Sequence, residues 1–393
     1  MTPADPGVKQ ALQNWTRRLI FVAVAGIVAM AIGFLTNRND AMRAYLFGYI
    51  FWTGVGMGFL GILLLMHMVG GKWGVAIRRF CEAGAATLPF MAILLIPILL
   101  NMDALYGWVL PEARNDPLVQ SKTLYLNMPF FVIRSAIYFG VFLLYIHLIR
   151  KRSQALEGST FESGVTRLKR LCAPGVVVFI VTSSFAAIDW IMSIEPDWFS
   201  SVYGATFLVG SAISAMLISI IGLLLWKRYA QDSEVITPAH FHDLANMVLM
   251  FTALWGYLAF SQYLIIWAGD LPDETGWYFR RLNGGWQYLA IVLVIFHFVL
   301  PLFLLLMRDI KRSFGALMAV CVMFLAARFV DVYWLIIPAW GNQGGTAPWM
   351  NFVAWFAFGA IWLGILVYRL QERSLIPRSD PRLLTPPREP VVY

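Results

Sequence analysis

Long apolar runs recur along almost the whole sequence, and they limit the possible folds more than any other feature. Most of them have about 18 to 25 residues, the length that an α-helix needs to cross a bilayer. Inside a bilayer every backbone polar group must find a partner within the protein, so each run predicts a transmembrane helix. The ten predicted spans are 19–36, 44–66, 83–101, 124–149, 173–194, 201–225, 244–268, 286–307, 314–338 and 351–369.

Composition supports the same fold class. Of the 393 residues, 60% are hydrophobic and only 13% are charged, whereas a soluble domain has roughly 25% charged residues. We therefore expect an all-α, polytopic membrane protein. The formal charge of +8 does not indicate a nucleic-acid partner, because the basic residues lie in alternate loops and not in one patch.

The placement of Lys and Arg predicts the orientation. With the N-terminal tail in the cytoplasm, most of the 30 basic residues fall on the cytoplasmic side. The positive-inside rule then places both termini in the cytoplasm. The opposite side holds Arg38, Arg43, Arg114, Lys122, Arg280 and Arg281.

The first span could instead be a signal peptide, since Arg17 and Arg18 precede an apolar run that contains the small residues AVAG. The run continues to Leu35 and a long tail precedes it, which favours a membrane span. Removing the segment would leave nine spans and the same position of the C-terminus.

Two aspartates predict an internal repeat. Asp189 and Asp331 are each followed by Pro seven positions later and by Trp nine positions later. Both lie in spans of the same direction, so spans 2–5 and 6–9 would be two parallel four-helix units. Alternatively, Pro ends a helix and Trp lies at the membrane interface in both places. The predicted division is 1–43 (tail and first span), 44–200 (first bundle), 201–340 (second bundle) and 341–393 (tenth span and Pro-rich cytoplasmic tail).

Four charged residues fall inside the predicted spans, where each costs about 2.5–3.5 kcal/mol on insertion scales and therefore needs a partner or a wet cavity. Arg328 and Asp331 are three positions apart and predict a pair on one helix face. Arg134 has a long side chain that could reach Asp189 from a neighbouring span. These pairs would either tie helices together or form a proton path or polar site that opens to the outer face.

Weaker candidates accompany these charges. Glu195 and Asp197 follow Asp189 near the outer boundary, where protons could leave to water. His297 lies mid-membrane, four residues before Pro301, and suits a hydrogen-bonding or proton-relay role. His67 could join that route, or pair with a second histidine as a haem ligand, although a buried histidine without such a role is the simpler interpretation.

Two other motifs have structural interpretations. Gly54 and Gly58 show GxxxG spacing within an apolar run, which predicts a close helix-packing face and not a nucleotide loop. Cys81, Cys172 and Cys321 are far apart and form no CxxC motif. The sequence therefore predicts no metal site and no iron–sulfur cluster or c-type haem held by this chain alone.

The segment SSFAAIDWIMSIEPDWFSSVYGATFLVG, residues 183–210, resembles the F subunits of alternative complex III. This bacterial quinol:electron-acceptor oxidoreductase belongs to the wider NrfD-like, or polysulfide-reductase-like, membrane family. The ten spans, the chain length, the motif HFHDL at 240–244 and the Pro-rich C-terminal tail agree with the resemblance.

The resemblance implies two four-helix bundles with spans 1 and 10 beside them, in the bacterial inner membrane of a respiratory or photosynthetic chain. It implies a homologous sister subunit with the better supported quinol site, an iron–sulfur protein, c-type cytochromes and lipids as partners. Haem c and iron–sulfur clusters would belong to those partners. A quinone is the one cofactor that this chain itself could bind, so whether the chain is an enzyme stays open.

Four functional hypotheses follow. In the leading one, Asp189 and Asp331, tuned by Arg134 and Arg328, line a proton route with His67 and His297 as further members. In the second, Asp189 lies in a quinone pocket near the outer face together with Trp190 and Trp198. In the third, the chain is a free-standing secondary transporter. In the fourth, it is a purely structural scaffold of the complex.

Overall fold

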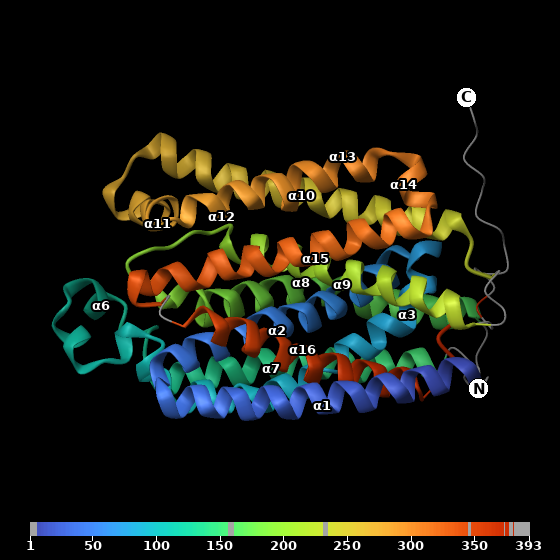
Figure 1. Ribbon diagram of the computed structural model, residues 1–393, viewed down its shortest axis with the longest axis horizontal. Coiled ribbons are helices and arrows are strands. Elements are labelled where there is room, and N and C mark those ends of the chain that lie inside the picture. Colours follow the sequence, from blue (N-terminus) through green and yellow to red (C-terminus); the bar gives the residue numbers. More distant parts are fainter. Residues whose placement is uncertain are drawn as a thin grey trace.

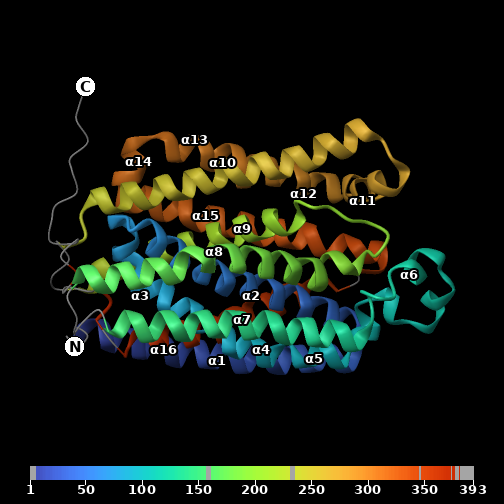
Figure 2. The same ribbon diagram turned by 180° about the vertical axis from the view of Figure 1, so that it is seen from behind.

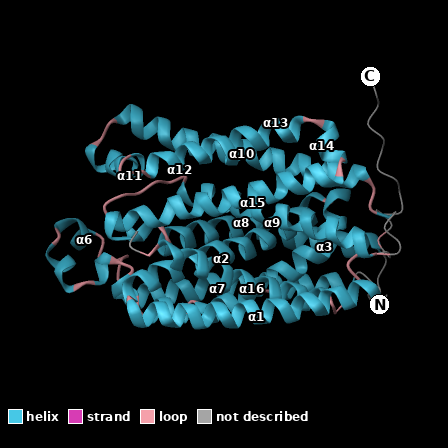
Figure 3. Ribbon diagram, in the orientation of Figure 1, coloured by secondary structure: helices cyan, strands magenta, loops and turns pink. Residues whose placement is uncertain are grey.

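The computed structural model describes residues 6–155, 161–230, 235–344, 347–372, 374–376 and 380. Its regular structure is entirely helical, and none of the described residues lies in a strand (Figure 3). Among these described residues, ten helices are long and apolar enough to cross a membrane, and each overlaps one predicted span. The chain is an all-α, polytopic membrane protein, as the sequence predicts.

The helices run mostly parallel to one long axis (Figure 1). The ten spans are α1 (Pro6–Thr36), α2 (Arg38–Val69), α3 (Lys72–Ala85) with α4 (Leu88–Leu94) and α5 (Ile96–Leu100), α7 (Met128–Ala155), α8 (Phe161–Trp190), α9 (Tyr203–Tyr229), α10 (Pro238–Gly269), α12 (Trp286–Val292) with the π-helix η6 (Leu293–Val299) and α13 (Leu300–Leu306), α15 (Phe314–Ile336) and α16 (Pro348–Leu370).

Local chemistry explains several boundaries. The Asn37 side chain accepts a hydrogen bond from the Asp40 amide and caps the start of α2. Gly70, which follows the last residue of α2, caps its end with a φ of 77°. The third span is broken twice because Pro89 and Pro97 have no amide hydrogen to donate to the preceding turn. Its three short helices nevertheless follow one another closely enough to form a single crossing.

The helices fall into two neighbouring groups. In the first, α2, α3, α7 and α8 contact one another, and in the second, α9, α10, η6 with α13, and α15 do so. The central contact between the groups is that of α2 with α9, while α1 and α16 pack together beside α2. In Figure 1, α10 and α13 lie along one long side and α1 along the other, and Figure 2 shows α7 and α8 on the far face. This arrangement agrees with the two predicted bundles, whose division into domains stays a prediction.

The two ends of the helices differ. One end carries η1 (Met102–Ala104), η2 (Gly107–Val109), η3 (Pro111–Asn115) and α6 (Pro117–Ser121), which project from it, together with η4 (Met192–Ile194), α11 (Pro272–Leu282) and η7 (Ile337–Gly344). We call it the loop end. The opposite end carries α14 (Arg308–Arg312) and the start of α1.

The GxxxG prediction is confirmed. A Cβ added at Gly54 would lie 2.8 Å from the Phe207 ring and 3.0 Å from the Ser211 hydroxyl of α9. A Cβ at Gly58 would overlap the backbone carbonyl of Ser211. The two glycines therefore allow the backbones of α2 and α9 to approach directly where the two helix groups meet.

We expect Gly58→Ala to destabilise the protein by about 1–3 kcal/mol, since the added methyl group meets rigid backbone and must separate α2 from α9. The matched control is Gly140→Ala on α7, where a Cβ meets no atom within 4 Å. Thermal unfolding of the purified protein in detergent measures both. Equal melting temperatures for the two variants would show that α2 and α9 do not depend on this close approach.

Candidate functional site

Asp189 lies at the end of α8 in a closed network of hydrogen bonds. Arg134 of α7 donates to both carboxylate oxygens, from Nε at 2.7 Å and from Nη2 at 3.0 Å. The Tyr138 hydroxyl, one turn further along α7, donates to Oδ2 at 2.6 Å. Asp189 is fully buried, and its charge is balanced by a guanidinium that also contacts the Tyr125 carbonyl at 2.8 Å. The cross-helix pair that the sequence predicts is formed.

The tryptophans near Asp189 are also buried. The Trp190 indole donates to the Ser135 hydroxyl at 3.0 Å, and its ring stacks on Phe139. Trp198 stacks on Trp277 of α11 with ring centroids 4.6 Å apart. Both rings therefore pack against the protein's own side chains, Trp190 against α7 and Trp198 against α11.

A second buried cluster joins α9, η6 and α15. Arg328 is 2% exposed and donates to Oδ2 of Asp331, which forms the predicted pair on α15. Arg328 also donates to the Ser214 hydroxyl at 3.2 Å and contacts Nε2 of His297 at 3.3 Å. The same histidine nitrogen lies 4.0 Å from Oδ2 of Asp331. Thus Asp331, Arg328 and His297 form one contiguous group.

The histidine ring has a defined role in this cluster. A guanidinium can only donate, so Nε2 of His297 accepts, and hydrogen-bond logic places the ring hydrogen on Nδ1. Nδ1 is buried and has no hydrogen-bond partner among the described residues. The Trp255 ring packs on the imidazole at 4.0 Å between centroids. The contacts of His297 with the buried pair of Arg328 and Asp331 mark it as a candidate functional group.

Two backbone features make room for the cluster. His297 lies in the π-helical turn η6, and Pro301 four residues later has no amide hydrogen for the His297 carbonyl. π-helical turns within α-helices are frequent at functional sites. On α9, a Cβ at Gly210 would overlap the Arg328 guanidinium, so only glycine leaves the space that Arg328 occupies.

The two aspartates differ in what they face. Asp189 has no exposed surface, whereas 13% of the Asp331 side chain is exposed. Asp331 opens into a cavity of about 840 Å³ between α9, α10, α11, α12, η6 and α15. Within the described part of the chain it is the single charged side chain that lines this cavity. Asp189, Trp190 and Trp198, around which the sequence places a quinone pocket, do not line it.

The rest of the cavity wall is mostly apolar, and about half of its residues are aromatic. Its polar part lies toward the loop end, where Gln262 donates to the Tyr278 hydroxyl at 3.2 Å and accepts from Ser200 at 2.9 Å. Burial raises the pKa of the Tyr278 phenol to about 12, so its hydroxyl stays protonated near neutral pH. The cavity therefore combines one carboxylate with neutral hydrogen-bonding groups.

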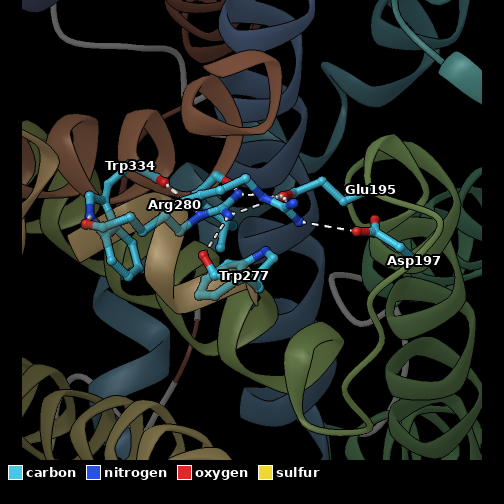
Figure 4. Close-up of polar contacts among 7 residues, drawn as sticks. Glu195, Asp197, Trp277, Arg280 and Trp334 are labelled. Atoms are coloured by element: carbon cyan, nitrogen blue, oxygen red, sulfur yellow. Dashed lines mark hydrogen bonds and ion pairs between the residues drawn. The ribbon is translucent and has the colours of Figure 1, made fainter. Parts of the chain in front are cut away.

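Glu195 and Asp197 form an ion-pair cluster with α11 at the loop end (Figure 4). Arg281 is fully buried and donates to Glu195 Oε2 at 2.6 Å and to the Leu335 carbonyl at 2.9 Å. Arg280 contacts Glu195 at 2.8 Å and Asp197 at 3.4 Å. The cluster holds α11, which covers the cavity, against the segment after α8 and the end of α15.

The remaining sequence candidate, His67, lies in the last turn of α2, where it is 8% exposed. His147, its possible partner as a haem ligand, lies exposed on α7. Within the described ranges, no three side chains of the types His, Cys, Asp and Glu gather as metal ligands. His67 is thus placed apart from the cluster of Asp331, and its role in a proton route stays a prediction.

Sequence reasoning missed several residues of these sites. Tyr138 follows Arg134 by four positions and so shares its helix face. This spacing could have predicted Tyr138 as a second partner of Asp189. Gly210 and Ser214 have the same spacing on α9. Arg281 and Trp255 gave no comparable signal, because their importance depends on contacts between segments far apart in the chain.

Comparison of the chain with protein-family models and with curated proteins finds no match. The fold and the site themselves define the class of protein: an integral, multi-pass α-helical membrane protein with a buried Arg–Asp–His cluster beside a cavity.

Proposed function

We propose that the chain is a membrane subunit of a quinol:electron-acceptor oxidoreductase of the alternative complex III type, and that Asp331 carries protons in it. One observation supports the proton role above the others. Asp331 is a buried carboxylate that contacts Arg328, lies near His297 and lines a cavity whose polar part lies toward the loop end. Ionisable groups within membrane spans are costly, and those beside a cavity commonly serve ion or proton pathways.

The cluster has the chemistry that proton transfer requires. Arg328 stabilises the ionised carboxylate, while the cavity gives a proton donor or acceptor access to Asp331. His297 offers a second titratable group 4.0 Å away. A proton can thus bind to Asp331 from one side without a large movement of the helices, and the Arg328 charge favours its later release.

Asp189 has a different environment. Its carboxylate accepts three hydrogen bonds and is closed off from the cavity. This geometry favours the structural interpretation of the pair with Arg134, as a tie between α7 and α8. A role of Asp189 in proton transfer stays a prediction, and so does a role of Glu195 and Asp197 at the proton exit.

Membership of a complex is supported by the resemblance of residues 183–210 and by the ten spans. The loop end holds the few basic residues of the predicted outer side, such as Arg38, Lys122 and Arg280. We therefore propose that this end faces away from the cytoplasm of a bacterial inner membrane, with both termini inside. The electron-carrying haem c and iron–sulfur groups would lie in partner subunits.

Mass spectrometry of the proteins that copurify with the tagged chain tests this membership. We expect a c-type cytochrome, an iron–sulfur protein and a second membrane subunit of similar length in a fixed ratio after mild detergent extraction. A matched preparation from cells with an untagged chain controls for contaminants. Isolation of the chain alone would reject the complex, and the cavity beside Asp331 would then be the substrate site of a transporter.

A further inference from the structure

Another cavity lies at the end opposite to the loop end, where α3, α7 and α16 come together (Figure 2). Its volume of about 70 Å³ gives room for about five water molecules or for one phosphate group. Three arginines line it, Arg79, Arg150 and Arg369, and we call it the basic pocket. Ile146 and Leu370 belong to its apolar part. The pocket thus places guanidinium groups beside an apolar surface.

Glu82 of α3 lines the basic pocket and is already engaged by the protein. It accepts hydrogen bonds from Arg79 at 2.8 Å, from Arg78 at 3.1 Å and from the Ser153 hydroxyl at 2.6 Å. Two guanidinium groups therefore share this carboxylate. One positive charge remains uncompensated on this side of the pocket.

The same imbalance recurs on the other side of the basic pocket. Glu372 accepts from Arg369 at 2.8 Å, whereas its nearest distance to Arg150 is 3.9 Å, which is too long for a hydrogen bond. The Arg150 side chain is 55% exposed, and among the described residues this is its one ionic contact. A second positive charge therefore remains. An anion with several acceptor oxygens would compensate both charges, as phosphates do when arginines bind them.

The position of the basic pocket favours a lipid as the source of this anion. Arg150 and Arg369 lie where the predicted apolar runs of α7 and α16 end, at the level of the lipid head groups. Ala86 lines the pocket, and Phe90 and Ile93 follow it along the same span with 40% and 62% of their surface exposed. These apolar side chains face the bilayer beside the pocket. Basic pockets between membrane helices are a common form of site for anionic lipid head groups.

We propose that the basic pocket binds a phosphate group, and that a phospholipid of net negative charge such as phosphatidylglycerol supplies it. The phosphate oxygens accept from Arg150 and Arg369, and the acyl chains lie along α4. A zwitterionic lipid binds less tightly, because its ammonium group is repelled by the surplus positive charge. The basic pocket and the cavity of Asp331 lie at different places in the fold, so this proposal does not rest on the proposed function.

Native mass spectrometry of the full-length chain, with any subunits that stay bound, tests the site. The protein is stripped of lipid in mild detergent and titrated with phosphatidylglycerol or with phosphatidylcholine of the same acyl chains. We expect phosphatidylglycerol to reach half-saturation at a concentration about 5-fold lower. Arg150→Gln should raise that concentration about 5-fold, the effect of one basic residue near a membrane surface. Glu372→Gln should lower it, because it removes the carboxylate that Arg150 and Arg369 share.

The opposite signs separate binding from a structural role, since both variants disrupt the same ion pair. The matched control is Arg152→Gln, which removes the same charge from an exposed position on α7 outside the pocket and should change little. Melting temperatures without lipid record that each variant is folded.

Three results would overturn the proposal: equal affinities of the wild type for the two lipids, equal affinities of the wild type, Arg150→Gln and Glu372→Gln for phosphatidylglycerol, or an equal loss in Arg150→Gln and Arg152→Gln. The last would assign the effect to general attraction by surface charge. Inorganic phosphate is the third ligand in the titration, and we expect it to bind weakly. Tight binding of inorganic phosphate with the same response to the variants would reject a lipid as the source of the phosphate group.

Discussion

Arg134→Met alone is expected to destabilise the protein by about 3–5 kcal/mol, the loss that follows when one member of a buried ion pair is removed. Arg134 is 6% exposed and Asp189 is fully buried, so the remaining carboxylate cannot reach water. Among the described residues, the Tyr138 hydroxyl is the donor that would remain to it. The variant should therefore accumulate poorly in the membrane and melt at a much lower temperature than the wild type.

The double variant Arg134→Met with Asp189→Asn should recover most of this loss. Asparagine is uncharged and keeps an oxygen that accepts from Tyr138, so no buried charge remains without a partner. The exposed Arg170→Met on α8 is the control for removing a positive charge. Thermal melting in detergent and the amount of folded protein in membranes measure all three. A double variant as unstable as Arg134→Met would contradict the assignment of this pair as a tie between α7 and α8.

The fold was largely predictable from the sequence because membrane spans are encoded locally. Each span needs a long apolar run, and its helix satisfies its backbone hydrogen bonds internally. Neither requirement depends on contacts with residues far away in the sequence. The actual helices often extend past the predicted spans, as α2 does from Arg38 to Val69, since polar ends continue the helix beyond the apolar core. The breaks of the third span follow equally local rules, because they lie at Pro89 and Pro97.

The candidate site was only partly predictable. The pair of Arg328 with Asp331 is local, and the pair of Arg134 with Asp189 follows from the need of each buried charge for a partner. The contact of His297 with both Arg328 and Asp331 depends on how η6 packs against α15, which hydropathy does not encode. The cavity depends on gaps between side chains of six helical elements, which the sequence does not encode locally. The quinone pocket was therefore predicted around Asp189 and its tryptophans, which lie outside the cavity.

The ion pairs at the loop end illustrate the same limit. Arg280 and Arg281 counted in the sequence only as loop charges that set the orientation. Both pair with Glu195, from which Arg280 is separated by 85 positions and Arg281 by 86 positions in the sequence. Glu195 and Asp197 were predicted as candidates from their position after Asp189. The arginines that pair with them were not, because a count of loop charges contains no information on which residues meet in three dimensions.

Asp331→Asn is expected to slow proton transfer through this chain by about 10²-fold or more, the contribution typical of a group that accepts and releases a proton. Asparagine matches the shape of aspartate and can still accept from Arg328, so the cluster should assemble. Electron transfer through the partner subunits would continue, because the haem c and iron–sulfur groups lie in those subunits in our proposal. The defect should thus be one of coupling and not of electron flow, and Asp331→Glu should restore part of it.

The most direct test is the number of protons moved per electron by the complex reconstituted in vesicles, recorded with a pH-sensitive dye during quinol oxidation. We expect a lower ratio for Asp331→Asn at normal subunit content, and a ratio close to that of the wild type for Asp189→Asn once its assembly is confirmed. A wild-type ratio in fully assembled Asp331→Asn complex would contradict the proposed proton role of Asp331. A lowered ratio in Asp189→Asn alone would transfer that role to the first helix group.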